Sequence, residues 1–239
     1  MWGCHGSGPA NSTGEANARP AVPGTFEREQ SRPELAGAAR DEAIAPARAV
    51  DVDPNDKRPV LVCFGDSLTA GLGTGPDESY PDYLQADLDH LHYHYRVVNE
   101  GISGNTTKDG VERLPEILAL HPAVAVVEFG GNDGLRGLRI EDSRANLDEI
   151  VGTLKGAGVK VALAGITLPP DYGPDYIKQF DDTYAVLAKK YRVPMLPFLL
   201  KDVYGVPGMM QRDETHATAK GNVIVARNVV PLVLPLLKK

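Results

Sequence analysis

The sequence predicts an α/β fold, specifically a three-layer α/β/α sandwich built on a central, mostly parallel five-stranded sheet. Two observations predict this class. Short apolar runs typical of buried strands recur over residues 58–239, and segments with the apolar spacing of amphipathic helices separate them. Strands that alternate with helices form βαβ units, whose strands pair in parallel and whose helices cover both faces of the sheet.

Five apolar runs are predicted as strands. The run over residues 60–64 is β-branched, uncharged and bounded by turn formers, and residues 123–129 form the clearest buried strand of the chain. The other strands are predicted over residues 95–98, 159–164 and 193–197, the last of them short. Unusual polar residues follow several of these runs, and open α/β sheets bind their ligands at the carboxyl ends of their strands.

The helices predicted between the strands carry apolar residues at intervals of three and four positions. Ser79 is expected to cap the first helix, with Pro81 near its first turn. A second helix over residues 111–118 is expected to be perturbed by Pro115. Further helices are predicted over residues 143–155, around residues 176–187, and over residues 219–230, where Pro231 and Pro235 limit or kink the end.

Composition excludes some classes of partner. The chain of 239 residues carries 32 acidic and 25 basic residues, a formal net charge of -7, which disfavours nucleic acid. It contains no run of 18 apolar residues, so no transmembrane segment is predicted. Residues 1–57 are rich in Ala, Pro, Gly and charge, and are predicted to be a disordered or loosely docked arm before a catalytic domain over residues 58–239.

Gly65-Asp66-Ser67 follows the first predicted strand directly, and it has two interpretations. Ser67 is a candidate nucleophile, and the alternative is that Asp66 or Ser67 caps a following helix. A serine nucleophile needs a base, a carboxylate that orients the base, and donors for an oxyanion. His216 is the candidate base, and Asp213 lies close enough in sequence to reach its Nδ1 and leave Nε2 facing Ser67.

The Asp213-to-His216 segment also has a simpler interpretation, an exposed loop with Thr215 or Thr218 capping the final helix. Metal and cofactor signals are weak. The alternating histidines at positions 90, 92 and 94 straddle a helix end and a loop, with no carboxylate placed to complete a metal site. The glycine-rich loop over residues 70–76 lacks the Gly-Lys-Ser/Thr ending of a phosphate cradle. No metal and no cofactor are therefore predicted.

Taken together, four ordered blocks resemble the GDSL, or SGNH, hydrolases over residues 58–239. They are Gly65-Asp66-Ser67-Leu68, Gly104, Gly131-Asn132-Asp133 and Asp213-x-x-His216. Three longer stretches are similar to the bacterial thioesterase I/arylesterase/lysophospholipase branch in particular: Asn99-Glu100-Gly101-Ile102-Ser103-Gly104, Gly130-Gly131-Asn132-Asp133-Gly134-Leu135-Arg136-Gly137 and Leu168-Pro169-Pro170-Asp171-Tyr172-Gly173.

The resemblance implies a flavodoxin-like sandwich with Ser67 as nucleophile, His216 as base and Asp213 as its orienting carboxylate. The oxyanion hole would consist of the backbone N–H groups of Ser67 and Gly104 and the side-chain amide of Asn132. The expected activity is hydrolysis of short- to medium-chain carboxylic esters, extending to thioesters and lysophospholipids, with no cofactor. Substrate-binding residues are expected at Asp66, Leu68, Asp133, Leu135, Leu138 and Pro169, with the acyl group along the last three.

Three other functions fit parts of the sequence. A carbohydrate acetylesterase would use the same blocks, although the single tryptophan, Trp2, lies in the arm and leaves few aromatic platforms for a sugar. A flavin- or nucleotide-binding module could use the same fold, and a binding protein with an inactive site is the third. The resemblance also suggests a periplasmic or exported protein. A lipid anchor at Cys4 would agree with that location, although the apolar stretch that should precede a lipidated cysteine is missing. The chain as given also allows a cytoplasmic location.

Overall fold

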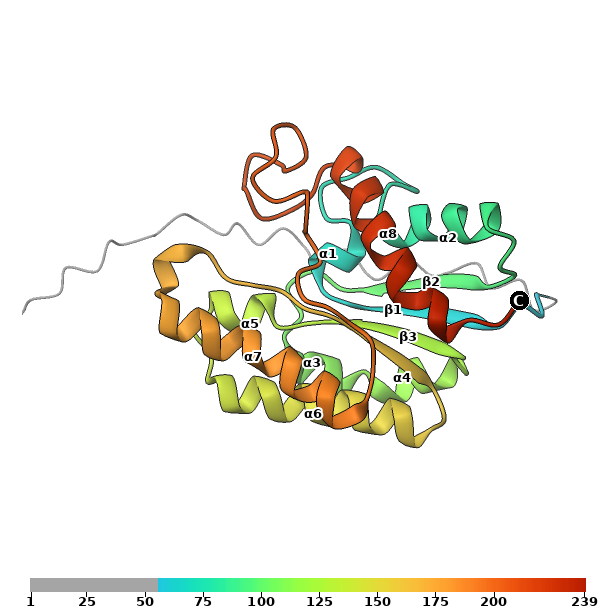
Figure 1. Ribbon diagram of the computed structural model, residues 1–239, viewed down its shortest axis with the longest axis horizontal. Helices are drawn as coiled ribbons and strands as arrows, with labels where there is room; N and C mark the ends of the chain where they lie inside the picture. Colours follow the sequence, from blue (N-terminus) through green and yellow to red (C-terminus); the bar gives the residue numbers. More distant parts are fainter. Residues whose placement is uncertain (1–55) are drawn as a thin grey trace, which may run out of the picture. The chain divides into compact units, whose positions relative to one another are not determined.

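The computed structural model describes residues 56–239 (Figure 1). Trp2, Cys4 and nearly all of the predicted arm lie outside the described residues. The described part contains a five-stranded sheet in the order β2-β1-β3-β4-β5, and every neighbouring pair is parallel. The strands are β1 (Val60–Gly65), β2 (Arg96–Gly101), β3 (Val124–Glu128), β4 (Lys160–Ala164) and β5 (Met195–Leu196). The α/β sandwich with a parallel sheet is therefore confirmed.

Helices cover both faces of the sheet. Figure 1 shows α2 and α8 on one face and α3 to α7 on the other. The helices are α1 (Ser67–Ala70), α2 (Tyr80–His90), α3 (Thr107–Glu112), α4 (Leu114–Ala119), α5 (Gly131–Leu135), α6 (Ile140–Gly156), α7 (Pro174–Tyr191) and α8 (Ala219–Val233), with 3-10 turns at Pro170–Tyr172 and Leu234–Leu236.

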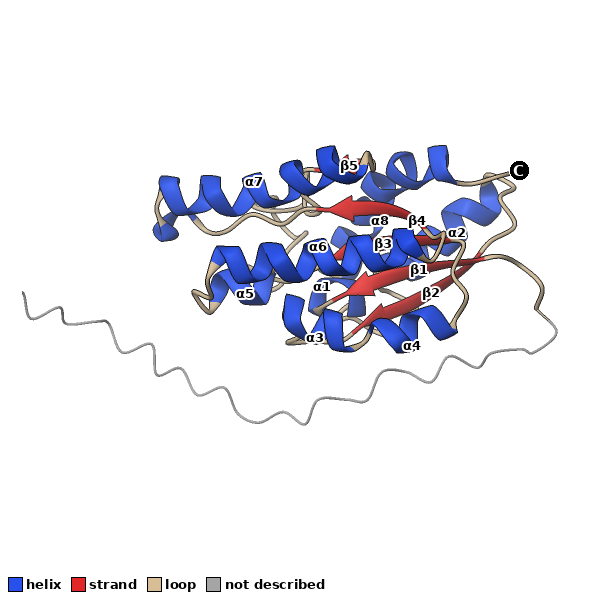
Figure 2. Ribbon diagram, turned by 90° about the horizontal axis from the view of Figure 1, so that it is seen from below, coloured by secondary structure: helices blue, strands red, loops and turns tan. Residues whose placement is uncertain are grey.

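The strand order contains a switch point between β1 and β3. Because β1 lies between β2 and β3, the chain connects β1 to β2 across one face and β3 to β4 across the other. The connections therefore separate at the carboxyl ends of β1 and β3, which is the position where open sheets of this kind bind ligands. Figure 2 shows the strands pointing in one direction, toward the end of the molecule that carries α1 and α5.

The core explains why the strands have continuous apolar sequences. All residues of β1 and β3 are buried, because helices cover the sheet on both sides. Phe64 of β1 and Phe129, which follows β3, pack edge to face with ring centroids 4.7 Å apart. Cys63 is a free, fully buried thiol in β1, and burial raises its pKa to about 12.

Several boundaries differ from the sequence prediction. The helix predicted over residues 111–118 is two helices, which meet at Arg113, and Pro115 lies in the first turn of α4, where a missing N–H removes no helical hydrogen bond. α8 continues past Pro231 to Val233 before the chain tightens into a 3-10 turn. β5 has two residues rather than the predicted five, since only Met195 and Leu196 pair with β4.

Candidate active site

The turn after β1 satisfies both interpretations of Gly65-Asp66-Ser67. Asp66 caps α1, because its Oδ1 accepts a hydrogen bond from the Leu68 backbone N–H at 3.1 Å. Ser67 is the first residue of that helix, and its Oγ lies 2.9 Å from Nε2 of His216. Capping and presentation of the serine hydroxyl are therefore properties of the same short turn.

Asp213 and His216 lie in the loop before α8 and contact each other. Oδ2 of Asp213 lies 2.7 Å from Nδ1 of His216, while Oδ1 accepts the backbone N–H groups of Thr215 and His216, each at 3.0 Å. Partial burial raises the pKa of Asp213, but the hydrogen bonds from the His216 ring and from the two backbone N–H groups outweigh it. The pKa of Asp213 therefore lies below its usual value of 3.8.

This arrangement fixes the tautomer of the imidazole. An ionised Asp213 accepts a hydrogen bond from the Nδ1–H group, which leaves the lone pair of Nε2 directed at the Ser67 hydroxyl. The loop that carries both residues ends where Thr218 caps α8, by accepting the Gly221 N–H at 3.2 Å. Of the two predicted caps, Thr218 is the one used.

The three predicted oxyanion donors, Ser67, Gly104 and Asn132, line one cavity. Among the described residues, no acceptor is bound to the backbone N–H groups of Ser67 and Gly104. Gly104 has a φ of 82°, in the left-handed region that favours glycine. The Asn132 amide nitrogen donates to Oδ2 of Asp66 at 3.1 Å and to the Asn105 carbonyl at 2.9 Å. Both amide hydrogens of Asn132 thus have acceptors within the protein.

A largely apolar cavity of about 330 Å³ opens beside these residues. It is lined by Ser67, His216, Gly104 and Asn132, and by four of the residues predicted to bind substrate, Asp66, Leu68, Leu135 and Pro169. Its remaining apolar lining comes from residues that sequence reasoning missed: Leu72, Ile166, Leu168, Phe198, Leu200 and Tyr204.

Two residues predicted to bind substrate do not line the cavity. Asp133 is 2% exposed, and its carboxylate accepts hydrogen bonds from the backbone and hydroxyl of Thr107 and from the Ser143 hydroxyl. It therefore joins α3, α5 and α6 instead of facing substrate. Leu138 is exposed, but it follows a turn at Gly137 (φ 64°) and lies outside the cavity lining.

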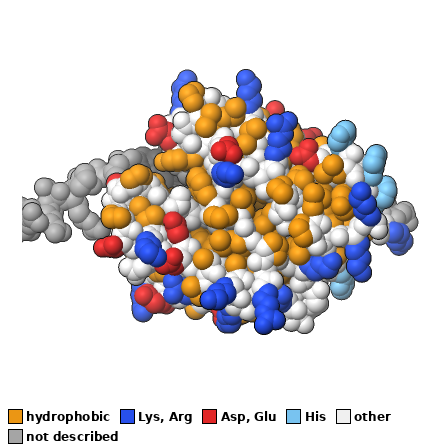
Figure 3. Space-filling model, in the orientation of Figure 1, with side chains coloured by type: hydrophobic (Ala, Val, Ile, Leu, Met, Phe, Trp, Pro, Cys, Tyr) orange, Lys and Arg blue, Asp and Glu red, His pale blue; other side chains and the backbone are white. Residues whose placement is uncertain are grey.

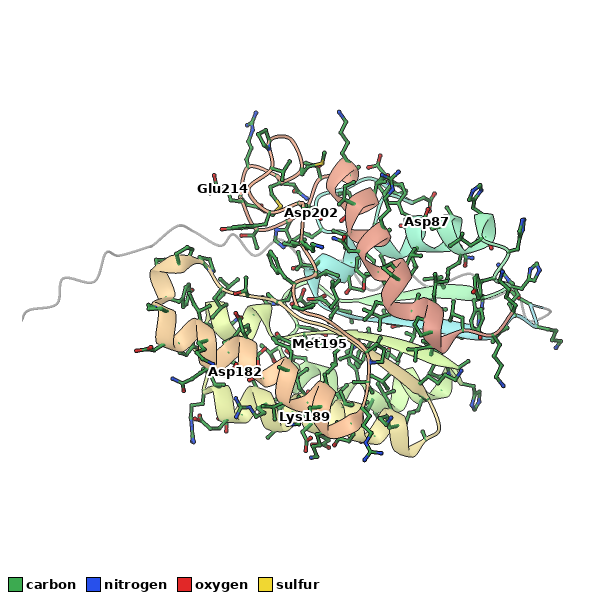
Figure 4. The ribbon with its side chains drawn as sticks, in the orientation of Figure 1. Asp87, Asp182, Lys189, Met195, Asp202 and Glu214 are labelled. Atoms are coloured by element: carbon green, nitrogen blue, oxygen red, sulfur yellow. The ribbon has the colours of Figure 1, made fainter. Side chains whose placement is uncertain are left out.

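The missed residues share a position that could have identified them. Phe198, Leu200 and Tyr204 follow the short β5, and Ile166 and Leu168 follow β4, so all five lie beyond carboxyl ends of strands. Figure 4 shows this end of the molecule, with Asp202 and Glu214 labelled in the segment between β5 and α8. That segment is tied to the glycine-rich loop after α1, because Nε2 of Gln211 donates to the Leu72 carbonyl at 2.7 Å.

Residues 56–239 contain no group of three His, Cys, Asp or Glu side chains that could hold a metal ion. The histidines visible in Figure 3 gather at one end of the molecule, near the C-terminus that Figure 1 marks. In the same part of the chain, none of the helices has the length and apolarity needed to cross a bilayer.

Known proteins resemble both the sequence and the fold. Residues 63–224 match the GDSL-like lipase/acylhydrolase family. The chain is 42% identical to esterase TesA of Pseudomonas aeruginosa over 178 residues, which cover 74% of this chain and 89% of that protein. It is 37% identical over 177 residues to the thioesterase 1/protease 1/lysophospholipase L1 of Escherichia coli, covering 74% of this chain and 84% of that protein.

A crystal structure of TesA superposes with a TM-score of 0.72 at 42% identity, covering 74% of this chain and 99% of that one. The family match spans most of the described residues and includes the turn of Ser67 and the loop of His216. The chain therefore belongs to the GDSL-like lipase/acylhydrolase family, and it is a carboxylic ester hydrolase.

Proposed function

We propose that the protein hydrolyses short- to medium-chain carboxylic esters through an acyl-enzyme on Ser67. The observation that carries this proposal is the chain of contacts from Asp213 through His216 to Ser67, which lies in the lining of an apolar cavity. A nucleophile, a base and an orienting carboxylate in this order are the parts that acyl transfer requires.

In the proposed first step, Nε2 of His216 accepts the Ser67 proton as Oγ attacks the ester carbonyl. The negative charge that develops on the carbonyl oxygen would be stabilised by the backbone N–H groups of Ser67 and Gly104. Asn132 would supply the third donor, which requires one of its amide hydrogens to leave or share its acceptor.

In the second step, the protonated His216 gives its proton to the leaving alcohol, and the acyl group stays on Ser67. Water then attacks the acyl-enzyme with His216 again as base, which releases the carboxylic acid and restores the hydroxyl. Asp213 remains ionised throughout and stabilises the imidazolium that forms in each step.

The cavity supports the choice of substrate. Its walls are mainly leucine, isoleucine, proline and aromatic side chains, which suit an acyl chain better than a sugar. A volume of about 330 Å³ fits a short or medium chain. The family match favours ester hydrolysis over a flavin- or nucleotide-binding module, while thioesters and lysophospholipids remain candidate substrates within the proposal.

Hydrolysis of p-nitrophenyl esters of increasing chain length tests the proposal. We expect Ser67→Ala to lower kcat by about a thousandfold or more, since removal of a triad member leaves only binding and oxyanion stabilisation. Ser103→Ala is the matched control, a serine next to Gly104 that the cavity does not include, and it should keep its activity. Full activity in Ser67→Ala would overturn the assignment.

A further inference from the structure

A buried carboxyl group lies under the turn that presents Ser67. Glu128 is the last residue of β3 and is 0% exposed. Its Oε2 accepts a hydrogen bond from the Thr69 hydroxyl at 2.7 Å and from the Asp66 backbone N–H at 3.3 Å. These two donors lie on either side of Ser67 in sequence, so a single side chain holds both ends of the nucleophile turn.

Gly65 provides the space for this contact. It is paired with Glu128 in the parallel register of β1 and β3, and it has no side chain. A Cβ added to Gly65 would lie 2.5 Å from Oε2 of Glu128 and would also collide with the Thr69 hydroxyl. The glycine that precedes Asp66 and Ser67 therefore leaves room both for the buried carboxyl and for the backbone carbonyl of Glu128, which a Cβ would approach to 2.6 Å.

The surroundings of Glu128 favour its neutral form. Among the described residues, Oε1 has no hydrogen-bond partner, and no basic side chain bonds to the carboxyl. Burial raises the pKa of Glu128 well above its usual value, and the nearby Asp66 carboxylate raises it further. The other titratable groups that face this region are Tyr80 of α2, which contacts the Thr69 hydroxyl at 3.3 Å, and Tyr184 of α7, which donates to the Phe129 carbonyl at 2.8 Å.

We propose that Glu128 is a positioning residue that acts as a neutral carboxylic acid, holding Asp66 and Thr69 so that Ser67 Oγ is aimed at His216. The proposal rests on the proposed role of Ser67 as nucleophile. Glu128 lies behind the turn, outside the cavity lining, and acts only through that turn.

Ionisation of Glu128 would disturb the site. It would put a second negative charge beside Asp66, whose Oδ2 is the acceptor for the Asn132 amide. Repulsion between two carboxylates in a buried region is strong because the local dielectric is low. Activity should therefore fall at alkaline pH as Glu128 loses its proton, and a neutral amide at the same position should not show that loss.

The test compares Glu128→Gln and Glu128→Ala on one p-nitrophenyl ester over a range of pH. We expect Glu128→Gln to keep at least a third of the wild-type kcat at neutral pH and to keep its activity to higher pH than the wild type. We expect Glu128→Ala to lose at least tenfold in kcat with less than a threefold change in KM. Glu149→Gln, an exposed glutamate of α6, should behave as the wild type in both respects.

Thr69→Val removes the donor of the shorter of the two hydrogen bonds to Glu128 and leaves Glu128 itself in place. This variant therefore tests the proposal even if Glu128→Ala fails to fold. A wild-type kcat in folded Glu128→Ala or in Thr69→Val would overturn the proposal. The proposal would also be overturned if Glu128→Gln were as inactive as Glu128→Ala, or if Glu128→Gln lost activity at the same alkaline pH as the wild type. Full activity in Ser67→Ala would instead refute the role of Ser67 as nucleophile. Failure of the Glu128 proposal can therefore be distinguished from failure of the proposed function.

Discussion

The side-chain amide of Asn132 donates a hydrogen bond to Oδ2 of Asp66 across 3.1 Å, from the end of β3 to the end of β1. The other carboxylate oxygen of Asp66 accepts the Leu68 N–H that begins α1. One buried carboxylate therefore orients both the serine turn and the third proposed oxyanion donor. Burial raises the pKa of Asp66, because the buried surroundings disfavour the charged form of this carboxyl group.

Asp66→Asn tests this double role. An asparagine side chain has a single oxygen, so it can accept from Leu68 or from Asn132 but not from both in the same geometry. We expect kcat to fall about ten- to a hundredfold, less than for full loss of an oxyanion donor. KM should change little, because Asp66 orients other groups and fills only a small part of the cavity wall.

Steady-state kinetics on one p-nitrophenyl ester measure the effect, and Asp142→Asn, an exposed aspartate in the first turn of α6, is the control. Equal kcat values for the Asp66 and Asp142 variants would contradict the role given to Asp66. Thermal melting shows whether a fall in kcat comes from unfolding. The Asp66→Asn variant should stay folded, because asparagine caps helices about as well as aspartate.

The sheet could be predicted from the sequence because its strands have local signals, and Asp213 and His216 could be paired as candidates for the same reason. β1 and β3 are continuous apolar runs, and Asp213 and His216 are close enough in sequence for a short turn to join them. β5 gave a weaker signal, because a strand of two residues carries almost no periodicity. The helix break at Arg113 was anticipated only as a perturbation near Pro115.

The cavity wall and the supporting contacts could not be predicted in the same way. Asp133 follows Asn132 in sequence, yet the short α5 directs its carboxylate toward Thr107 and Ser143. In the sequence, Glu128 is an ordinary polar residue at the end of a strand. Its contact with the serine turn follows from the register of β1 and β3, which pairs it with Gly65. Such roles depend on which strands become neighbours, and a single sequence does not encode that locally.

Gly65→Ala should destabilise the protein. The added methyl group would lie 2.6 Å from the Glu128 carbonyl oxygen, which belongs to the backbone of a central strand and cannot move freely. We expect a loss of about 1 to 3 kcal/mol in the free energy of unfolding, measured by urea denaturation. Gly156→Ala, at the end of α6 where a Cβ meets nothing within 4 Å, should instead be neutral or slightly stabilising. Equal stability of the two variants would show that the turn can relax.

Asp213→Asn should change both activity and the dependence of stability on pH. We expect kcat to fall about a thousand- to ten-thousandfold, because the neutral amide does not keep the imidazole in the tautomer protonated on Nδ1 and does not stabilise the imidazolium. The pKa of Asp213 is lower in the folded state than its usual value of 3.8, so ionised Asp213 stabilises the fold above pH 3.8. This stabilisation is lost as the pH falls through the folded-state pKa.

Urea denaturation at pH 7, 5 and 3 measures this second effect. The wild type should be more stable than the Asp213→Asn variant at pH 7 and pH 5, with a difference that narrows below pH 3.8. The difference should be small, since the Asp213 side chain is 48% exposed and water screens its charge. A gap in stability that is the same at all three pH values would show that the Asp213 carboxylate does not titrate as described.

Leu135 and Leu138 form a matched pair that tests which surface contacts the acyl chain. They are 43% and 42% exposed, but only Leu135 lines the cavity. Leu135→Ala should lower kcat/KM for a hexanoyl ester about three- to tenfold relative to an acetyl ester, since a buried methylene is worth about 0.8 kcal/mol and the contact is partial. Leu138→Ala should leave the ratio of the two esters unchanged. Equal effects at the two positions would mean that substrate spreads beyond the cavity over the outer surface of this loop.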